Sequence, residues 1–198
     1  MLYFVPTPIG NIEDTTLRAI RLFKECQLII CEDSRQIRKL LQLLEIANRP
    51  QFLDITYHHR FNRAKIQKAL LNSKDEGFTV LVVSDSGTPG ISDPGNQIVR
   101  MARELQLDFR VLPGATALIP AVVASGFLTK EFVFLGFLPV KKGRNKALQT
   151  LQSYKFPVVL YESIHRLPKL QQELGQFVED CFEVCVCQEI TKKFDKSS

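Results

Sequence analysis

Residues 79–95 read TVLVVSDSGTPGISDPG, an apolar strand pattern that runs directly into a loop of twelve residues. This loop, residues 84–95, contains three glycines, two prolines and two aspartates. Proline fixes φ and glycine permits close backbone approach, so a loop of this composition is rigid and offers main-chain groups to a ligand. It is also longer than the roughly two to six residues that usually join a strand to a helix. We therefore interpret it as a ligand loop rather than a bare turn.

The same strand–loop–helix pattern repeats along the chain. Apolar residues recur at helical spacings of three and four between most of the strand-like runs, for example at Ile37, Leu40, Leu41 and Leu44. Strands that alternate with helices predict an α/β fold with a parallel or mixed sheet covered on both faces. The predicted strands lie at 2–5, 28–31, 53–57, 79–83, 109–112, 132–137, 158–161 and 182–187.

A domain boundary is expected near Pro113, because five strand–helix steps precede it and a smaller α/β unit follows. Residues 1–113 would form a Rossmann-like α/β domain, and residues 114–198 a C-terminal α/β domain. Ligands of open α/β sheets bind outside the carboxyl ends of the strands. We therefore expect two α/β domains that share a ligand cleft.

The composition is that of a folded protein. Of the 198 residues 45% are hydrophobic and 24% are charged, which excludes a disordered tail or a fibre. The longest apolar runs are far too short to cross a bilayer, so we expect a soluble, cytoplasmic protein. Of the five cysteines, Cys185 and Cys187 form an isolated CxC, which is a weak metal signal. We expect reduced structural thiols and no metal site.

The positive charge is concentrated in one segment. The net charge is +5, but residues 130–169 hold eight basic and two acidic residues, a local charge of +6, and the rest of the chain carries −1. A basic surplus confined to one stretch is what a polyanion-binding face would give. A solvated lysine-rich loop would give the same pattern, and from charge alone the two interpretations stay open.

The loops exclude several ligands. The chain has no GxxxxGK[ST] phosphate loop and no GxGxxG fingerprint, and Asp85-Ser86-Gly87 lacks the second Asp of a DxDx phosphatase motif. Loops rich in Gly, Pro, Ser and Asp, without a lysine to hold phosphate, suit a cofactor that has no phosphate, such as S-adenosylmethionine. Candidate acids or bases near strand ends are His58, His59 and His165.

Seven segments in one order carry a resemblance to a known family. They are TPIGN at 7–11, EDSR at 32–35, the loop 84–95, LPGATAL at 112–118, GFLP at 136–139 with KKG at 141–143, YES at 161–163 with HR at 165–166, and EITK at 189–192. Together they resemble the ribosomal RNA small subunit methyltransferase I family, which has the fold of the tetrapyrrole (class III) methylases. The resemblance covers residues 2–192. It implies methyl transfer from S-adenosylmethionine to the ribose 2′-OH of a cytidine in 16S rRNA of the small ribosomal subunit, by a homodimer with its cofactor cleft between two domains.

The resemblance also implies site residues by position. A ribose hydroxyl is a poor nucleophile and gains from a base, so the catalytic candidates are His58 and Glu162. The cofactor contacts would be Ile9, Asp85, Thr88, Thr116, Ala117 and Tyr161. The candidate RNA contacts are Arg35 and, within the basic segment, Lys141, Lys142, Arg144, Lys146 and Arg166.

Two features depart from the family pattern. Residues 57–62 read YHHRFN where the family has a YHEHNE-like stretch, so only Tyr57 and His58 match in register. The family continues well past the motif at 189–192, so we expect a truncated C-terminal domain. Two alternatives follow: a class III methylase of a small tetrapyrrole-like molecule, and a catalytically silent RNA-binding module. The basic segment and the loops 32–35 and 84–95 argue against the first alternative, and the altered stretch and the early stop make the second plausible.

Overall fold

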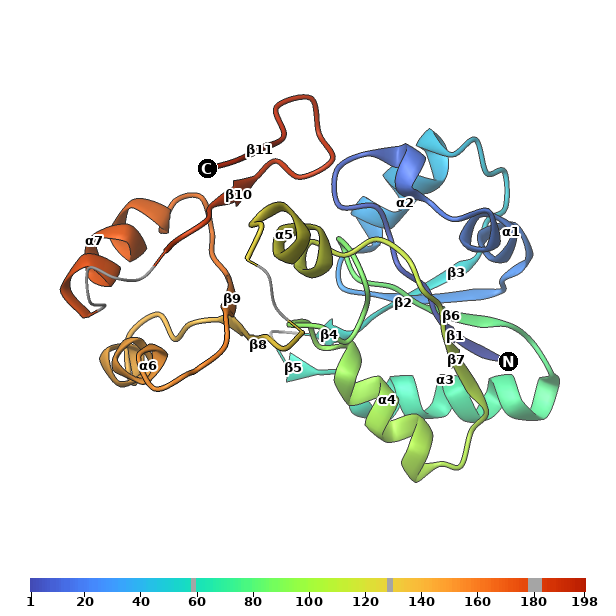
Figure 1. Cartoon of the computed structure of the whole chain (residues 1–198). Helices are drawn as coiled ribbons and strands as arrows, with labels where there is room; N and C mark the ends of the chain where they lie inside the picture. Colours follow the sequence, from blue (N-terminus) through green and yellow to red (C-terminus); the bar gives the residue numbers. More distant parts are fainter. Residues whose placement is uncertain (58–59, 128–129, 178–182) are drawn as a thin grey trace. The chain divides into compact units, whose positions relative to one another are not determined.

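The computed structural model describes residues 1–57, 60–127, 130–177 and 183–198. The chain divides into two compact units (Figure 1). The N-terminal unit consists of Met1–Ala117 together with Glu189–Lys193, and the C-terminal unit of Leu118–Gln188 together with Phe194–Ser198. The segment 189–193 therefore belongs to the N-terminal unit although it lies near the end of the sequence.

The N-terminal unit is built on a sheet of five parallel strands, which confirms the predicted α/β fold. The order across the sheet differs from the order along the chain, as expected when helices connect parallel strands. Across the sheet the strands are β3 (Gln51–Asp54), β2 (Leu28–Cys31), β6 (Val80–Val82), β1 (Leu2–Phe4) and β7 (Phe109–Val111).

Two helices cover each face of this sheet (Figure 1). Side chains alternate along a strand, so Val5 faces one layer while Leu2 and Phe4 face the other. Each fully buried apolar side chain contributes roughly 1.5–3 kcal/mol, and two such layers give this unit a large core. The first face packs against α1 (Leu17–Glu25) and α2 (Ser34–Leu43), and the second against α3 (Arg63–Glu76) and α4 (Gly95–Glu104).

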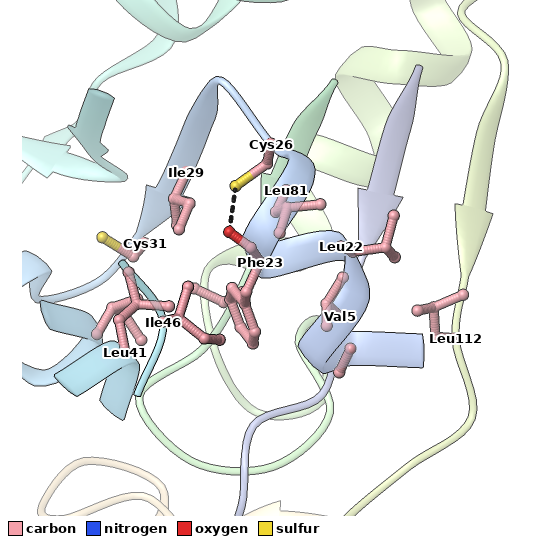
Figure 2. Packing of buried hydrophobic residues seen from close by; sticks show 13 residues of the cluster. Val5, Leu22, Phe23, Cys26, Ile29, Cys31, Leu41, Ile46, Leu81 and Leu112 are labelled. Carbon is pink, nitrogen blue, oxygen red and sulfur yellow. Dashed lines mark hydrogen bonds between the residues drawn. The ribbon is translucent and has the colours of Figure 1, made fainter. Parts of the chain in front are cut away.

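Two thiols belong to the first of these layers (Figure 2). Cys26 and Cys31 are buried, and the Cys26 thiol donates to the Phe23 carbonyl at 3.6 Å. Burial raises the pKa of each thiol to about 12, which keeps both protonated and unreactive. Within the described residues, no three His, Cys, Asp or Glu side chains are grouped so that they could hold a metal ion.

The C-terminal unit has a smaller core. Strands β8 (Val133–Phe137) and β9 (Val158–Tyr161) pair in parallel, and four buried leucines lie between them and two helices. The remaining elements are α5 (Leu118–Ala124), α6 (Arg144–Leu151), α7 (Leu167–Phe177), β10 (Cys187–Gln188) and β11 (Lys196–Ser197). No helix in the described part of the chain has the length and apolar character needed to cross a membrane.

Two predicted strands were wrong in extent. The run 53–57 is divided between the end of β3 and β4 (Thr56–Tyr57), which pairs with β5 (Arg60–Phe61) in an antiparallel hairpin. Of the run 182–187, residue 182 lies outside the described residues and 183–186 are not strand. Among the described residues of that run, Cys187 is the one in a strand, and it pairs with Ser197 of the short β11.

The segment 189–193 lies on the loop that follows β1. The Thr191 hydroxyl binds the Asp14 carboxylate. The Lys192 stem lies so close to Gly10 that a Cβ at residue 10 would be 2.3–2.9 Å from its carbons. Next to this contact is an open hollow of about 530 Å³, lined by Gly10, Asn11, Ile12, Leu43, Thr191, Lys192 and Lys193.

Candidate functional site

The chain leaves neighbouring strands of the large sheet toward opposite faces. β6 lies between β2 and β1, whose following loops lead to α2 and α1 on one face. The loop after β6 leads instead to α4 on the other face. Ligands of open α/β sheets bind outside the carboxyl ends of the strands at such a switch point. The loop 84–95 therefore lies where a ligand is expected.

Asp93 holds this loop in shape. Its carboxylate accepts hydrogen bonds from the backbone N–H groups of Gly90 at 2.8 and 2.9 Å, Ile91 at 3.1 Å and Gly95 at 2.6 Å. Gly95 has no room for a side chain, because a Cβ there would lie 2.7 Å from Asp93 Oδ1 and 2.9 Å from the Gly90 nitrogen. Asp93 is thus a structural residue, and Asp85 is the other carboxylate of the loop.

Hydrogen bonds join this loop to the loops that follow β1 and β7 at the same edge of the sheet. The N–H groups of Thr7 and Gly87 each donate to the other's carbonyl at 3.0 Å. The Thr7 hydroxyl donates to the Ser84 carbonyl at 3.0 Å, and the Thr88 hydroxyl donates to the Ala115 carbonyl at 3.0 Å. The loops after β1, β6 and β7 are therefore held together by short polar contacts.

These contacts bring several predicted cofactor residues together around Gly87. A Cβ placed on Gly87 would lie 3.4 Å from Ile9 Cγ2 and 3.9 Å from Thr116 Cα. Thr88 is the next residue in the chain, and Ala117 follows Thr116 at the end of the main segment of the N-terminal unit. Ile9, Thr88 and Thr116 come from three different loops, yet they lie around Gly87. The φ of Gly87 is +84°, a backbone conformation that favours glycine.

Carboxylates gather where β2 and β6 end side by side. Asp85 Oδ1 accepts a hydrogen bond from the Asp33 N–H at 3.1 Å, and Glu32 Oε1 accepts one from the Asp85 N–H at 3.4 Å. Burial raises the pKa of both Glu32 and Asp85, and the charge of neighbouring aspartates raises it further. A cationic or hydrogen-bond-donating ligand would relieve this unfavourable environment.

The neighbouring Asp33 already has a cationic partner. The Arg35 guanidinium binds its carboxylate at 2.7 Å, and this hydrogen bond lowers the pKa of Asp33 to about 2. The Arg35 side chain itself remains 88% exposed. The sequence prediction named Asp85 and did not name Glu32, which follows the buried strand β2 directly and accepts a hydrogen bond from the Asp85 N–H.

Tyr161, the sixth predicted cofactor residue, belongs to the C-terminal unit. It ends β9 and is the register partner of Phe137 on β8. Its ring lies 4.9 Å from the ring of Phe134 and 5.6 Å from that of Phe137, centroid to centroid. The structure therefore gives Tyr161 an aromatic environment.

Arg144 does not lie on the surface, contrary to the expectation of an RNA contact. Its side chain is 5% exposed and binds Glu173 through Nε at 2.8 Å and Nη2 at 2.6 Å. It also donates to the Pro139 carbonyl at 3.1 Å and lies 3.6 Å from Glu162. Sequence reasoning missed this because Glu173 is 29 residues away in the chain.

Glu162 belongs to the same buried ion network. Its side chain is 6% exposed and binds Arg166 at 2.6 Å in addition to its contact with Arg144. These two ion pairs hold the Glu162 carboxylate, and its catalytic role stays a prediction. His58, the other catalytic candidate, lies outside the described residues.

The other predicted RNA contacts differ in exposure. Lys141, Lys142 and Lys146 are exposed, and the first two lie in the turn that precedes α6. Arg166 is 32% exposed and is held by Glu162. Within residues 141–146 the exposed positive charge is therefore that of the three lysines, while Arg144 is buried.

Comparisons with known proteins agree with this architecture. The family profile described as Tetrapyrrole (Corrin/Porphyrin) Methylases matches residues 1–197. Among solved structures, a uroporphyrin-III C-methyltransferase from Thermus thermophilus, complexed with S-adenosylhomocysteine, is similar with a TM-score of 0.66. That similarity covers all of this chain and 86% of the other at 19% identity, and therefore concerns the fold alone.

Curated relatives named ribosomal RNA small subunit methyltransferase I are much closer in sequence. The relative from Halalkalibacterium halodurans is 40% identical over 98% of this chain, and that from Synechocystis is 41% identical over 97%. The chain spans 66% and 67% of the length of these two relatives, and 85% of a 38% identical relative from Coprothermobacter proteolyticus. The chain therefore belongs to the tetrapyrrole (corrin/porphyrin) methylase family and, within it, to the group of ribosomal RNA small subunit methyltransferase I proteins.

Proposed function

We propose that the protein transfers a methyl group from S-adenosylmethionine to the ribose 2′-OH of a cytidine in 16S rRNA of the small ribosomal subunit. The observation that carries this proposal is the 36–41% identity to relatives of that name over nearly the whole chain. The switch-point loop, with its carboxylates and main-chain groups, supports a cofactor at the carboxyl edge of the large sheet.

The donor set of this edge fits S-adenosylmethionine. Glu32 and Asp85 carry pKa values that burial has raised, so a ligand with positive charge would stabilise their ionised forms. S-adenosylmethionine has a sulfonium, an ammonium group and ribose hydroxyls, and carries no phosphate. When bound, it supplies an activated methyl group, and the chain has to hold and orient it.

We assign roles to the residues of this edge. The Asp85 carboxylate accepts hydrogen bonds from the ribose hydroxyls or the ammonium group of the cofactor. Glu32 positions Asp85 by accepting a hydrogen bond from its backbone N–H. Ile9, Thr116 and Ala117 would line the pocket around Gly87. Thr88 keeps the loops after β6 and β7 together through its hydroxyl, so its contribution to the cofactor is the position of its backbone. Tyr161 remains a predicted contact.

The RNA would bind through the lysines of the C-terminal unit. Lys141, Lys142 and Lys146 are exposed and can bind phosphate oxygens. Arg35 is also exposed, although Asp33 shares its charge. Methyl transfer is a displacement at carbon with a good leaving group, so alignment of the hydroxyl with the methyl group supplies much of the rate.

The test is transfer of labelled methyl from S-adenosylmethionine to 30S particles that lack the modification, followed by mapping of the labelled nucleotide. We expect label on one cytidine 2′-OH with the parent, and the same with Asp75→Asn, an exposed carboxylate on α3. Asp85→Asn should transfer much less at limiting cofactor.

The alternatives predict other results. Label in a tetrapyrrole and none in rRNA would identify a small-molecule methylase. RNA binding without S-adenosylmethionine binding would identify a silent RNA-binding module. Sedimentation equilibrium would test the homodimer, and fractionation of the producing cell would test the cytoplasmic location.

A further inference from the structure

Strand β8 contains a bulge that changes the direction of its aromatic side chains. The pairing of β8 with β9 shifts register between Phe134 and Gly136, and Gly136 has a φ of +63°, which favours glycine. In a regular strand, residues three apart point to opposite faces. The extra residue in the bulge places Phe134 and Phe137 on the same face, and both rings contact Tyr161.

The two faces of this small sheet are therefore different. Leu135, Val158 and Leu160 pack against the buried leucines of α6 and α7. The other face is aromatic, and Phe137 at its edge is 51% exposed. A single exposed apolar side chain is common, but here a backbone irregularity orients it and a tyrosine ring supports it at 5.6 Å.

The turn that follows Phe137 in the chain carries two lysines. Lys141 and Lys142 follow at four and five residues, so their Cα atoms lie within about 18 Å of the Phe137 Cα. Arg144 fixes this turn through two hydrogen bonds. Its guanidinium donates to the Pro139 carbonyl at 3.1 Å, and its backbone N–H donates to the Lys141 carbonyl at 3.2 Å. An exposed aromatic ring and a positioned pair of lysines thus occupy one short stretch of chain.

We infer that Phe137 stacks on an unpaired nucleobase of the RNA, while Lys141 and Lys142 bind phosphates of the same strand. Proteins recognise single-stranded RNA by this combination, since every base offers a π face and every nucleotide a negative charge. Tyr161 supports the ring from behind through its register position on β9. The inference deepens the proposed function and rests on it.

The experiment measures affinity for 30S particles at several salt concentrations, and affinity for S-adenosylmethionine by calorimetry. Phe137→Ala should weaken binding of the particles by roughly 5- to 150-fold, the range for loss of one stacked base, and leave the salt slope unchanged. Phe137→Tyr keeps the ring and should bind within about twofold of the parent. Lys141→Ala should reduce the salt slope by roughly 0.7 units instead.

Phe156→Ala is the matched control. Phe156 is 45% exposed in the same unit but lies before β9, at the opposite end of that strand from Tyr161. Its replacement should leave both affinities unchanged.

Three results would overturn the inference. Equal binding of particles by Phe137→Ala and the parent would exclude stacking. Weaker binding of S-adenosylmethionine by Phe137→Ala, with RNA affinity unchanged, would assign the ring to the cofactor. A parent that binds no RNA would overturn the proposed function, and this assignment with it.

Discussion

Replacement of Arg144 by Met should destabilise the C-terminal unit more than any change among the neighbouring lysines. Methionine keeps most of the apolar stem but removes every hydrogen bond of the guanidinium. That guanidinium binds Glu173 at 2.6 and 2.8 Å and the Pro139 carbonyl at 3.1 Å, and it lies 3.6 Å from Glu162. In the variant, the buried carboxylate of Glu162 and the partly buried carboxylate of Glu173 would be left without this cationic partner.

The expected loss in free energy of unfolding is about 3 kcal/mol. Removal of one partner of a buried ion pair usually costs about 3–5 kcal/mol. The lower end applies here, because Glu173 is 16% exposed and has Lys169 at 3.8 Å, while Glu162 keeps Arg166. The loss is comparable to the roughly 1.5–3 kcal/mol that one buried leucine contributes, and the core cluster formed by the described residues of this unit contains four buried leucines.

Thermal unfolding followed by far-UV circular dichroism would measure the effect. For a unit of this size, Arg144→Met should lower the midpoint temperature of the first unfolding transition by roughly 12–24 °C, whereas Lys142→Met should leave it unchanged. Arg144 lowers the pKa of Glu173, so the stabilisation is present while that carboxylate is ionised. The stabilisation should disappear as the pH falls through the lowered pKa of Glu173, which lies below the usual Glu pKa of about 4.3. An Arg144→Met transition within 2 °C of the parent at neutral pH would refute the reasoning.

Four further outcomes follow from the site and the core. Asp85→Ala should weaken S-adenosylmethionine binding by roughly ten- to a hundredfold through loss of one charge-assisted hydrogen bond, and unchanged calorimetry would contradict the assignment. The pKa values of Glu32 and Asp85 are raised, so both carboxylates become protonated early on acidification. The affinity for the cofactor should therefore begin to fall at a pH above the usual Asp pKa of about 3.9. A constant affinity through that range would exclude both carboxylates. Replacement of Lys141, Lys142 and Lys146 together by Ala should reduce the salt slope of RNA binding by up to about 2 units and leave the cofactor affinity unchanged; the same slope as in the parent would mean a solvated loop. Metal analysis should find no stoichiometric zinc, and a chelator should leave Tm unchanged; a bound metal would overturn the structural interpretation of the cysteines.

The sequence predicts the large sheet well because its information is local. Apolar runs such as 28–31 and 80–83 are fully buried, and their composition predicts strands without reference to distant residues. The loop 84–95 shows its importance through composition alone, since Gly and Pro restrict or release the backbone residue by residue. Strand order is also constrained, because short helical connections leave few arrangements.

What the sequence could not supply depends on distant partners. Arg144 sits among lysines in the sequence and shares their charge, but Glu173 and Glu162 draw it into the interior. The bulge in β8 has one local sign, Gly136 inside the predicted strand 132–137, but the residue left unpaired is defined by the register with β9. The helix α5 (Leu118–Ala124) was missed because it is apolar on every side and has no buried residue, so no helical periodicity marks it.

The return of residues 189–193 to the N-terminal unit has a consequence for the order in which the protein matures. Thr191 binds Asp14 across 177 positions of the chain, and Lys192 covers Gly10 in the loop after β1. A chain emerges from the ribosome N-terminus first, and its early segments fold while later ones are still being made. The five-stranded sheet can therefore form during translation, whereas the loop after β1 receives its cover only once residue 192 has been released. Synthesis of residues 118–188 thus precedes completion of the edge to which we assign the cofactor, which delays full assembly of that edge until the intervening chain exists.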